Sequence, residues 1–168
     1  SSTVQPPANL VEGEVLFFQL RPNGGRVIVG GSGPNTYHLR RNDIVIDLGG
    51  VDRYIQEPEP GGGMPVLPAT SIIIDMNGDD IYLSSEAPAQ GAGILGIDIL
   101  VDMAGDDQYL ARHFAQGCGI MGVGILMDGA GNDRYLMDTF GQAAGSFGVG
   151  ILIDRQGNDV LQARMLAQ

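Results

Sequence analysis

Apolar side chains alternate with small or acidic residues in a stretch that recurs along the second half of the chain. The stretch reads Val123-Gly-Ile-Leu-Met-Asp128, it returns as Val149-Gly-Ile-Leu-Ile-Asp154, and Ile97-Asp-Ile-Leu-Val-Asp102 has apolar residues in the matching places. A spacing of two is typical of a β-strand, because successive side chains point to opposite faces of a sheet. A helix is disfavoured, because each of the many glycines here would cost it about 1 kcal/mol. The pattern therefore predicts an all-β chain.

A nine-residue motif follows each predicted strand. Residues 75–83, 102–110 and 128–136 share the pattern Asp-x-x-Gly-x-Asp-x-Tyr-Leu, and degenerate copies lie at 30–38, 47–55 and 154–162. The starting positions of the six copies are separated by 17, 28, 27, 26 and 26 residues. A recurring period of this length is the signature of a solenoid, in which each repeat forms one structural unit. About 26 residues suit one coil of a parallel β-helix with two or three short strands.

We therefore predict a parallel β-helix, or β-solenoid, of about five to six coils over residues 30–168. Residues 1–29 depart from the repeat, and the apolar run Val15–Leu20 within them is expected to form a short capping strand on the N-terminal edge. Residues 57–68 contain four prolines, which predicts an irregular Pro/Gly-rich surface loop.

Equivalent residues of successive coils are expected to lie above one another, about 4.8 Å apart. The tyrosines at motif position eight should then stack, and glutamines that recur with the period should pass amide hydrogen bonds from rung to rung. Cys118 occupies the place of alanines in related repeats, so we interpret it as a small core residue. The predicted ladders are Tyr82, Tyr109 and Tyr135; Phe114, Phe140 and Leu166; and Gln90, Gln116, Gln142 and Gln168.

The motif resembles the nonapeptide of the repeats-in-toxin family, Gly-Gly-x-Gly-x-Asp-x-U-x, where U is a large apolar residue. Position four is Gly in all six copies, position six is Asp in five, and position eight is Tyr in five. The resemblance implies a parallel β-roll whose turns bind calcium. It covers 54 of the 168 residues, with one motif in each coil instead of a tandem run. At most one edge of the solenoid would therefore bind metal.

The aspartates at motif positions one and six should form two columns along one edge. Like charges at this spacing repel by about 1 kcal/mol per pair in water and by more inside a protein. Calcium would offset the repulsion, because it takes six to eight oxygen ligands, and Asp79 and Asp106 would add oxygens outside the turn. Alternatively, each aspartate caps its own turn by accepting backbone N–H groups, and raised pKa values relieve the repulsion. The predicted calcium ligands are Asp47, Asp52, Asp75, Asp80, Asp102, Asp107, Asp128, Asp133, Asp154 and Asp159.

The charge of the chain favours cations as partners. Twenty acidic residues stand against nine arginines, lysine is absent, and the net charge is −11. Nucleic acid is disfavoured because no basic cluster is available to replace the counterions of a phosphate backbone. The single cysteine excludes an internal disulfide, and no apolar run is long enough to span a membrane.

These observations predict a structural or interaction module, made rigid by calcium, of a larger bacterial protein that is secreted, periplasmic or on the cell surface. The last glutamine of the series falls at Gln168, so the final coil lacks a polar cap. Other protein chains or further repeats are therefore expected at the C-terminal end, and also on the face formed by the stacked glycines.

A carbohydrate-active β-helix enzyme is the alternative. Asp98 stands where the equivalent strands have Gly124 and Gly150. With Glu57, Glu59 and Glu86 it would form a carboxylate cluster of the kind that cleaves a polysaccharide.

Overall fold

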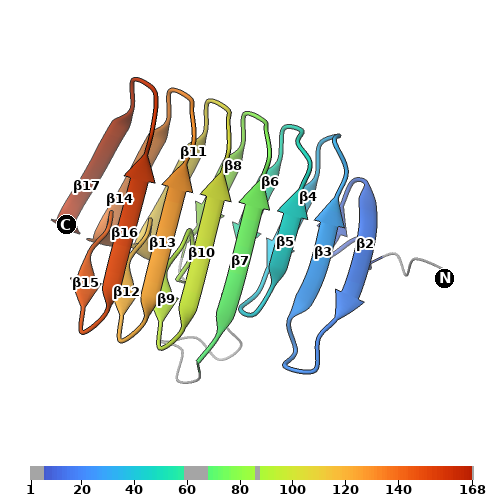
Figure 1. The fold of residues 1–168 in the computed structure, drawn as a ribbon, viewed down its shortest axis with the longest axis horizontal. Coiled ribbons are helices and arrows are strands. Elements are labelled where there is room, and N and C mark those ends of the chain that lie inside the picture. The colour runs from blue at the N-terminus through green and yellow to red at the C-terminus, as the bar shows by residue number, and fades with distance from the viewer. Residues whose placement is uncertain (1–5, 59–67, 86–87, 168) are drawn as a thin grey trace.

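The computed structural model describes residues 6–58, 68–85 and 88–167, and every regular element in these ranges is a β-strand. The strands wind into a parallel β-solenoid with two large sheets and one small sheet (Figure 1). The predicted all-β solenoid is confirmed. No helix in the described ranges has the length and apolar character to cross a membrane.

Two sheets of seven strands face each other across the core. The front sheet, nearer the viewer in Figure 1, contains β2 (Val15–Leu20), β3 (Arg26–Gly30), β5 (Ile44–Asp47), β7 (Thr70–Asp75), β10 (Ile97–Asp102), β13 (Val123–Asp128) and β16 (Val149–Asp154). The rear sheet contains β1 (Val11–Glu12), β4 (Thr36–Leu39), β6 (Arg53–Gln56), β8 (Ile81–Ser84), β11 (Gln108–Ala115), β14 (Arg134–Gly141) and β17 (Val160–Ala167). The small glycine-rich sheet contains β9 (Gly93–Ile94), β12 (Gly119–Ile120) and β15 (Gly145–Ser146).

The register of the sheets matches the sequence repeat. In the front sheet Asp75 pairs with Asp102, Asp102 with Asp128, and Asp128 with Asp154. In the rear sheet the motif tyrosines pair in the same way, from Tyr37 of β4 onward. One repeat therefore makes one coil, and equivalent residues lie above one another.

Antiparallel strands cover the N-terminal edge. β2 pairs antiparallel with β3, and β1 pairs antiparallel with β4, so both large sheets end in a strand that runs against the stack. The expected strand at Val15–Leu20 is thus present at the edge. The parallel stack itself begins with β3 at Arg26, within the segment 1–29 that the repeat did not cover. Of the expected loop 57–68, residues 59–67 lie outside the described residues.

The core is built around a continuous stack of tyrosine rings. Tyr82, Tyr109 and Tyr135 stack as predicted, and Tyr37 and Tyr54 extend the stack toward the N-terminus, with neighbouring ring centroids 4.6 to 5.0 Å apart. All five rings are buried, as are apolar side chains of the front strands. Regular stacking at the strand spacing thus gives the solenoid a single rigid core.

The other predictions about stacked residues agree with the structure only in part. Cys118 is a buried free thiol, as expected for a small core residue. The Phe114 and Phe140 rings are in contact, with centroids 5.6 Å apart and planes tilted by 51°, and the side chain of Leu166 lies outside the described residues. The prediction of amide-to-amide bonds between the glutamines is wrong. Gln90 Nε2 instead donates to two backbone carbonyls of the rear sheet, and Gln116 Nε2 does the same.

The glycine-rich segments lie inside the solenoid in the first two of their repeats. Gly91, Gly93, Gly117 and Gly119 are buried. A Cβ atom at Gly93 would overlap the carbonyl oxygen of Val123, and one at Gly119 would overlap that of Val149. These glycines thus let the small sheet approach the backbone of the front sheet, and the flat outer face expected from them is absent in these repeats.

Candidate metal centre

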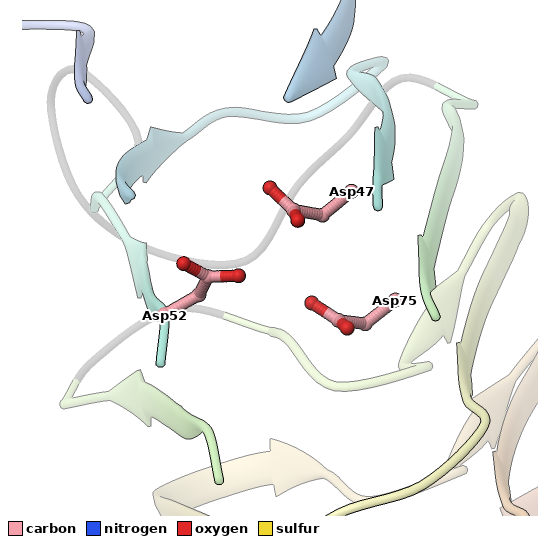
Figure 2. A group of neighbouring side chains, drawn as sticks. All are labelled: Asp47, Asp52 and Asp75. Carbon is pink, nitrogen blue, oxygen red and sulfur yellow. The ribbon is translucent and has the colours of Figure 1, made fainter. Parts of the chain in front are cut away.

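The motif forms the turn that joins each front strand to the following rear strand. Position one is the last residue of the front strand, and position six comes just before the rear strand. The two aspartate columns therefore follow one edge, as predicted, but their carboxylates point into the solenoid. Figure 2 shows this for Asp47 and Asp75, which extend from the front sheet toward Asp52 on the opposite side of the turn. These three side chains are fully buried.

Glycine at motif position four makes the stacked turns possible. Gly78 and Gly105 both have φ of 153°, a conformation that residues with a side chain rarely adopt. A Cβ atom at Gly105 would overlap the carbonyl oxygen of Gly78 in the preceding coil. The backbone N–H of Gly78 donates to the carbonyl of Ala104 at 2.9 Å, so each turn is also bonded to the next one. The turns thus stack through their backbones.

In the first column, formed by the aspartates at position one, Asp47, Asp75 and Asp102 have donors for both carboxylate oxygens, whereas Asp128 Oδ1 has no hydrogen-bond partner among the described residues. Asp102 Oδ1 accepts the backbone N–H of Ala104 at 3.2 Å, which is the Asx-turn expected of a capping residue. Asp102 Oδ2 accepts the hydroxyl of Tyr82, from the preceding coil, at 2.7 Å. The tyrosine hydroxyls make the same bond throughout the stack, from Tyr37 with Asp47 to Tyr135 with Asp154. Capping therefore accounts for the first three aspartates of this column.

Second-column aspartates, those at position six, have a donor for only one oxygen. Asp107 Oδ1 accepts the backbone N–H of Asp80 at 2.7 Å, and Asp133 Oδ1 accepts that of Asp107 at the same distance. This column therefore caps the turn of the preceding coil, not its own turn. The second oxygen has no hydrogen-bond partner among the described residues at four buried positions, which are Asp52, Asp80, Asp107 and Asp133.

The two columns come together in four groups of three carboxylates. In each group one carboxylate oxygen per residue lies within 4.8 Å of the others. The groups are Asp47, Asp52 and Asp75; Asp80, Asp102 and Asp107; Asp107, Asp128 and Asp133; and Asp133, Asp154 and Asp159. They contain all ten aspartates that the sequence singled out as metal ligands. The stacked motif thus brings every one of them into a possible cation site.

Burial sets the electrostatics of the ladder. It raises the pKa of Asp80 to about 9 and that of Asp107 to about 10, and the neighbouring carboxylates add to the effect. For Asp52, Asp102 and Asp133 burial raises the pKa to about 7. A buried carboxylate is stable only with a compensating charge or a proton. The ladder therefore needs cations or protons at neutral pH.

The first copy of the motif, at the N-terminal end of the ladder, has no aspartate at position six. Asn35 stands at position six, and its Nδ2 atom donates to Asp47 Oδ2 at 3.1 Å and to the Tyr37 hydroxyl at 2.7 Å. Gly30 stands at position one, where a Cβ atom would overlap the Tyr37 hydroxyl and the Asp47 carboxylate. The sequence contained this signal, as Asn in place of Asp, but its meaning depends on the contact with Asp47.

Asp79 and Asp106 lie outside the turn, as expected, and take no part in the four groups. Asp79 Oδ1 accepts the backbone N–H of Asp106 at 3.0 Å, and Asp106 Oδ1 accepts that of Asn132 at 2.8 Å. These side chains are exposed and form a separate surface ladder. They do not add oxygens to the buried sites.

The residues of the enzyme alternative do not form a described cluster. Asp98 accepts the backbone N–H of Ala92 at 3.0 Å, and burial raises its pKa to about 7. The cavity beside it is only about 20 Å³, too small for a sugar ring. Glu57 instead lies 2.8 Å from His38 Nδ1. Neither acid belongs to a group of three or more metal-ligating side chains in the described residues, and Glu59 and Glu86 lie outside those residues.

Comparison of the chain with models of protein families, with curated proteins and with solved structures gives no match. The likeness to the repeats-in-toxin family therefore rests on the motif alone. The fold and the acidic groups establish a β-solenoid with carboxylate clusters along one line of turns.

Proposed function

We propose that the chain is a structural β-solenoid whose turns bind calcium, and that it works as an interaction module of a larger bacterial protein. One observation carries the proposal. In four successive coils a second-column aspartate has a buried oxygen with no hydrogen-bond partner among the described residues, and the same aspartate belongs to a group with first-column carboxylates. A buried unpaired carboxylate oxygen is costly, and a cation bound to it removes that cost.

Charge and spacing both suit a divalent cation. Each coil contributes two aspartates to the ladder, so one divalent ion per coil would make it neutral. Two oxygens on opposite sides of a calcium ion lie about 4.8 Å apart, because calcium–oxygen bonds are about 2.4 Å long. The ligand oxygens of each group lie within 4.8 Å of one another, so one calcium ion can contact all three. Calcium accepts six to eight oxygens in flexible geometry, whereas magnesium demands near-ideal octahedral coordination.

The two oxygens of a second-column carboxylate have different partners. The Oδ1 atoms of both columns are acceptors for backbone N–H groups in the coils where these bonds form. The second-column Oδ2 atoms are left for the ion, so capping and cation binding are compatible in one residue. The ion would supply charge neutralisation within the fold, and no reaction is assigned to it.

A calcium ladder suits a chain outside the cytoplasm. Calcium modules with dissociation constants of about 10⁻⁴ to 10⁻³ M are typical of extracellular proteins, where the ion is abundant. We therefore propose a secreted, periplasmic or cell-surface location. As partners we propose other chains or further repeats beside β16 and β17, which are edge strands within the described part of the chain.

Thermal unfolding with and without millimolar calcium, after exhaustive chelation, tests the proposal when bound metal is quantified on the same sample. We expect several calcium ions per chain and a large rise of the midpoint with calcium, since a ligand that binds only the folded state stabilises it by about 1.4 kcal/mol per site at ten times its dissociation constant, and several sites add their contributions. An unchanged midpoint with no bound metal would show that shared protons neutralise the ladder.

Two neighbouring aspartates of one turn provide a matched pair of variants. Asp107→Asn removes a charge from two of the four groups, whereas Asp106→Asn removes one from the exposed surface ladder. We expect bound calcium to fall in Asp107→Asn and to stay unchanged in Asp106→Asn. Equal losses in both variants would point to binding on the outer surface of the turns.

A further inference from the structure

The outer face of the front sheet is an accessible aliphatic surface. Along each front strand from β3 to β16 one set of residues faces the core, as the buried Leu100 and Leu126 do, and the alternate set faces outward. The outward set forms two columns in register along the whole sheet, one from Val27 to Ile151 and one from Val29 to Ile153. We name these two columns the aliphatic plate.

The plate contains no charged residue. Its columns consist of valine and isoleucine with one methionine, Met127, although the chain has twenty acidic and nine basic residues. The outer face of the rear sheet differs, since Arg53, Gln108 and Arg134 stand in one of its columns. Charge is thus absent from one face of a chain whose net charge is −11.

Solvent reaches the plate and its margin in the described part of the chain. Ile153 is 42% exposed, and Ile97 and Val149, in a shorter column beside the plate, are 45% and 50% exposed. In Figure 1 the front strands lie side by side as one open layer nearest the viewer. Six strands at about 4.8 Å and five residues at about 3.3 Å give a footprint on the order of 500 Å². Isolated soluble domains rarely leave a larger apolar patch uncovered.

We propose that a second copy of this chain covers the plate, face to face, so that the front sheets of two solenoids pack against each other. Two plates would together remove about 1,000 Å² from solvent, which is the lower size for a specific interface. This contact is separate from the calcium ladder and from the edge strands β16 and β17. It makes the front sheet the inner layer of a four-layer assembly.

The uncharged plate lets a second copy bind without like charges at the contact. Two chains of charge −11 repel each other through most of their surfaces, and the plate is the face where they meet without like charges in contact. Spacing favours the same partner. The ridges of the plate repeat at the strand spacing, so the ridges of another copy have the spacing of the grooves between them.

Sedimentation equilibrium in millimolar calcium tests the proposal with a variant in each large sheet. Ile99→Glu places a charge at the centre of the plate, and Leu110→Glu places one on the outer face of the rear sheet in the same coil. We expect the wild-type chain to be dimeric at micromolar concentration. The dissociation constant should rise at least about 100-fold in Ile99→Glu, which corresponds to about 2.8 kcal/mol for a charge buried at the centre of the contact, and stay unchanged in Leu110→Glu.

Cross-linking provides a second measurement that does not depend on a disruptive charge. Ile125→Cys, joined by a short bismaleimide, should give a covalent dimer, and Leu136→Cys on the rear sheet should not. Cys118 would not interfere, because it is buried and burial raises the pKa of its thiol to about 12.

Three results would overturn the proposal. One is a wild-type chain that stays monomeric at about 200 μM, well above the dissociation constant of a specific dimer. Another is a dimer that both glutamate variants weaken equally while far-ultraviolet circular dichroism shows them folded. The third is a monomer that floats with vesicles of neutral phosphatidylcholine, which would assign the plate to a lipid surface.

Discussion

The first rung of the aspartate ladder, formed by the motif copy 30–38, differs from the interior rungs in the group that lies beside the buried carboxylate. In the first rung the Asn35 amide donates to Asp47, so that one carboxylate has a neutral donor beside it. In the interior rungs an aspartate replaces the asparagine, and its buried second oxygen has no hydrogen-bond partner among the described residues. The comparison teaches that position six accepts a backbone N–H of the preceding turn in the later coils, and that it needs a charge only where something else supplies the opposite charge.

The pH dependence of the metal-free protein is expected to show the largest effect. Burial raises the folded-state pKa of Asp80 to about 9 and of Asp107 to about 10, above the unfolded value of 3.8. A raised pKa contributes stability that is fully present below the unfolded value of 3.8 and is lost progressively as the pH rises from that value through the folded-state values. The free energy of unfolding should therefore fall by at least about 3 kcal/mol between pH 5 and 8.

Urea denaturation at a series of pH values, with chelator and with calcium, measures this dependence. Calcium competes with protons for the same oxygens, so its stabilising effect should grow as the pH rises. A metal-free protein whose stability is flat between pH 5 and 8 would contradict the high pKa values in the ladder.

Converting the first rung to the interior type should have the next largest effect. Asn35→Asp removes the amide donor to Asp47 and adds a second buried carboxylate. We expect the metal-free variant to lose about 2 to 4 kcal/mol at pH 7, because it leaves buried charge uncompensated. Calcium titration followed by calorimetry should reveal an additional bound ion. Equal stability of the variant and the wild type under chelation would show that the first rung tolerates charge.

The reverse conversion should make an interior rung resemble the first. Asp80→Asn keeps the oxygen that accepts the Asp52 N–H at 2.7 Å and provides an amide donor to the neighbouring carboxylates. We expect one bound calcium fewer, measured by elemental analysis, and a metal-free protein that is more stable at pH 8 by about 1 to 2 kcal/mol. Unchanged metal content would remove Asp80 from the set of ligands.

The smallest effect concerns the tyrosine hydroxyls. Tyr109→Phe removes the donor to Asp128 at 2.6 Å, which should cost about 1 kcal/mol. Tyr37→Phe should cost less, because Asn35 still donates to Asp47. Chemical denaturation of the two variants compares the rungs directly. A larger cost for Tyr37→Phe would mean that the amide does not replace the hydroxyl.

The sequence predicted the two aspartate columns but not the direction in which their side chains point. The period placed the ten aspartates in two columns, and the structure brings them into four groups. It did not reveal that the columns face the core, or that Tyr82 of one coil reaches Asp102 of the next. That bond joins residues of adjacent coils across the core, so it depends on the direction of both side chains as well as on their spacing.

The aliphatic plate was not predicted from the sequence, for a related reason. Strand β13 has apolar or small residues on both faces, with Ile125 outward and Leu126 inward. Hydrophobicity therefore gives the alternation but does not tell which set faces the core. The error over the glutamines has the same origin, because their amides bond to backbone carbonyls whose positions no residue pattern records.

The sequence by itself determined the coil, the stacked turn and the alignment of equivalent residues, because a repeat of fixed length with glycine at the bend permits one register. Only the tertiary structure decided which face of each strand is buried and which oxygens are left without donors. Those properties depend on how the two large sheets pack around the tyrosine stack. This packing joins residues of different coils, so no single repeat of the sequence contains it.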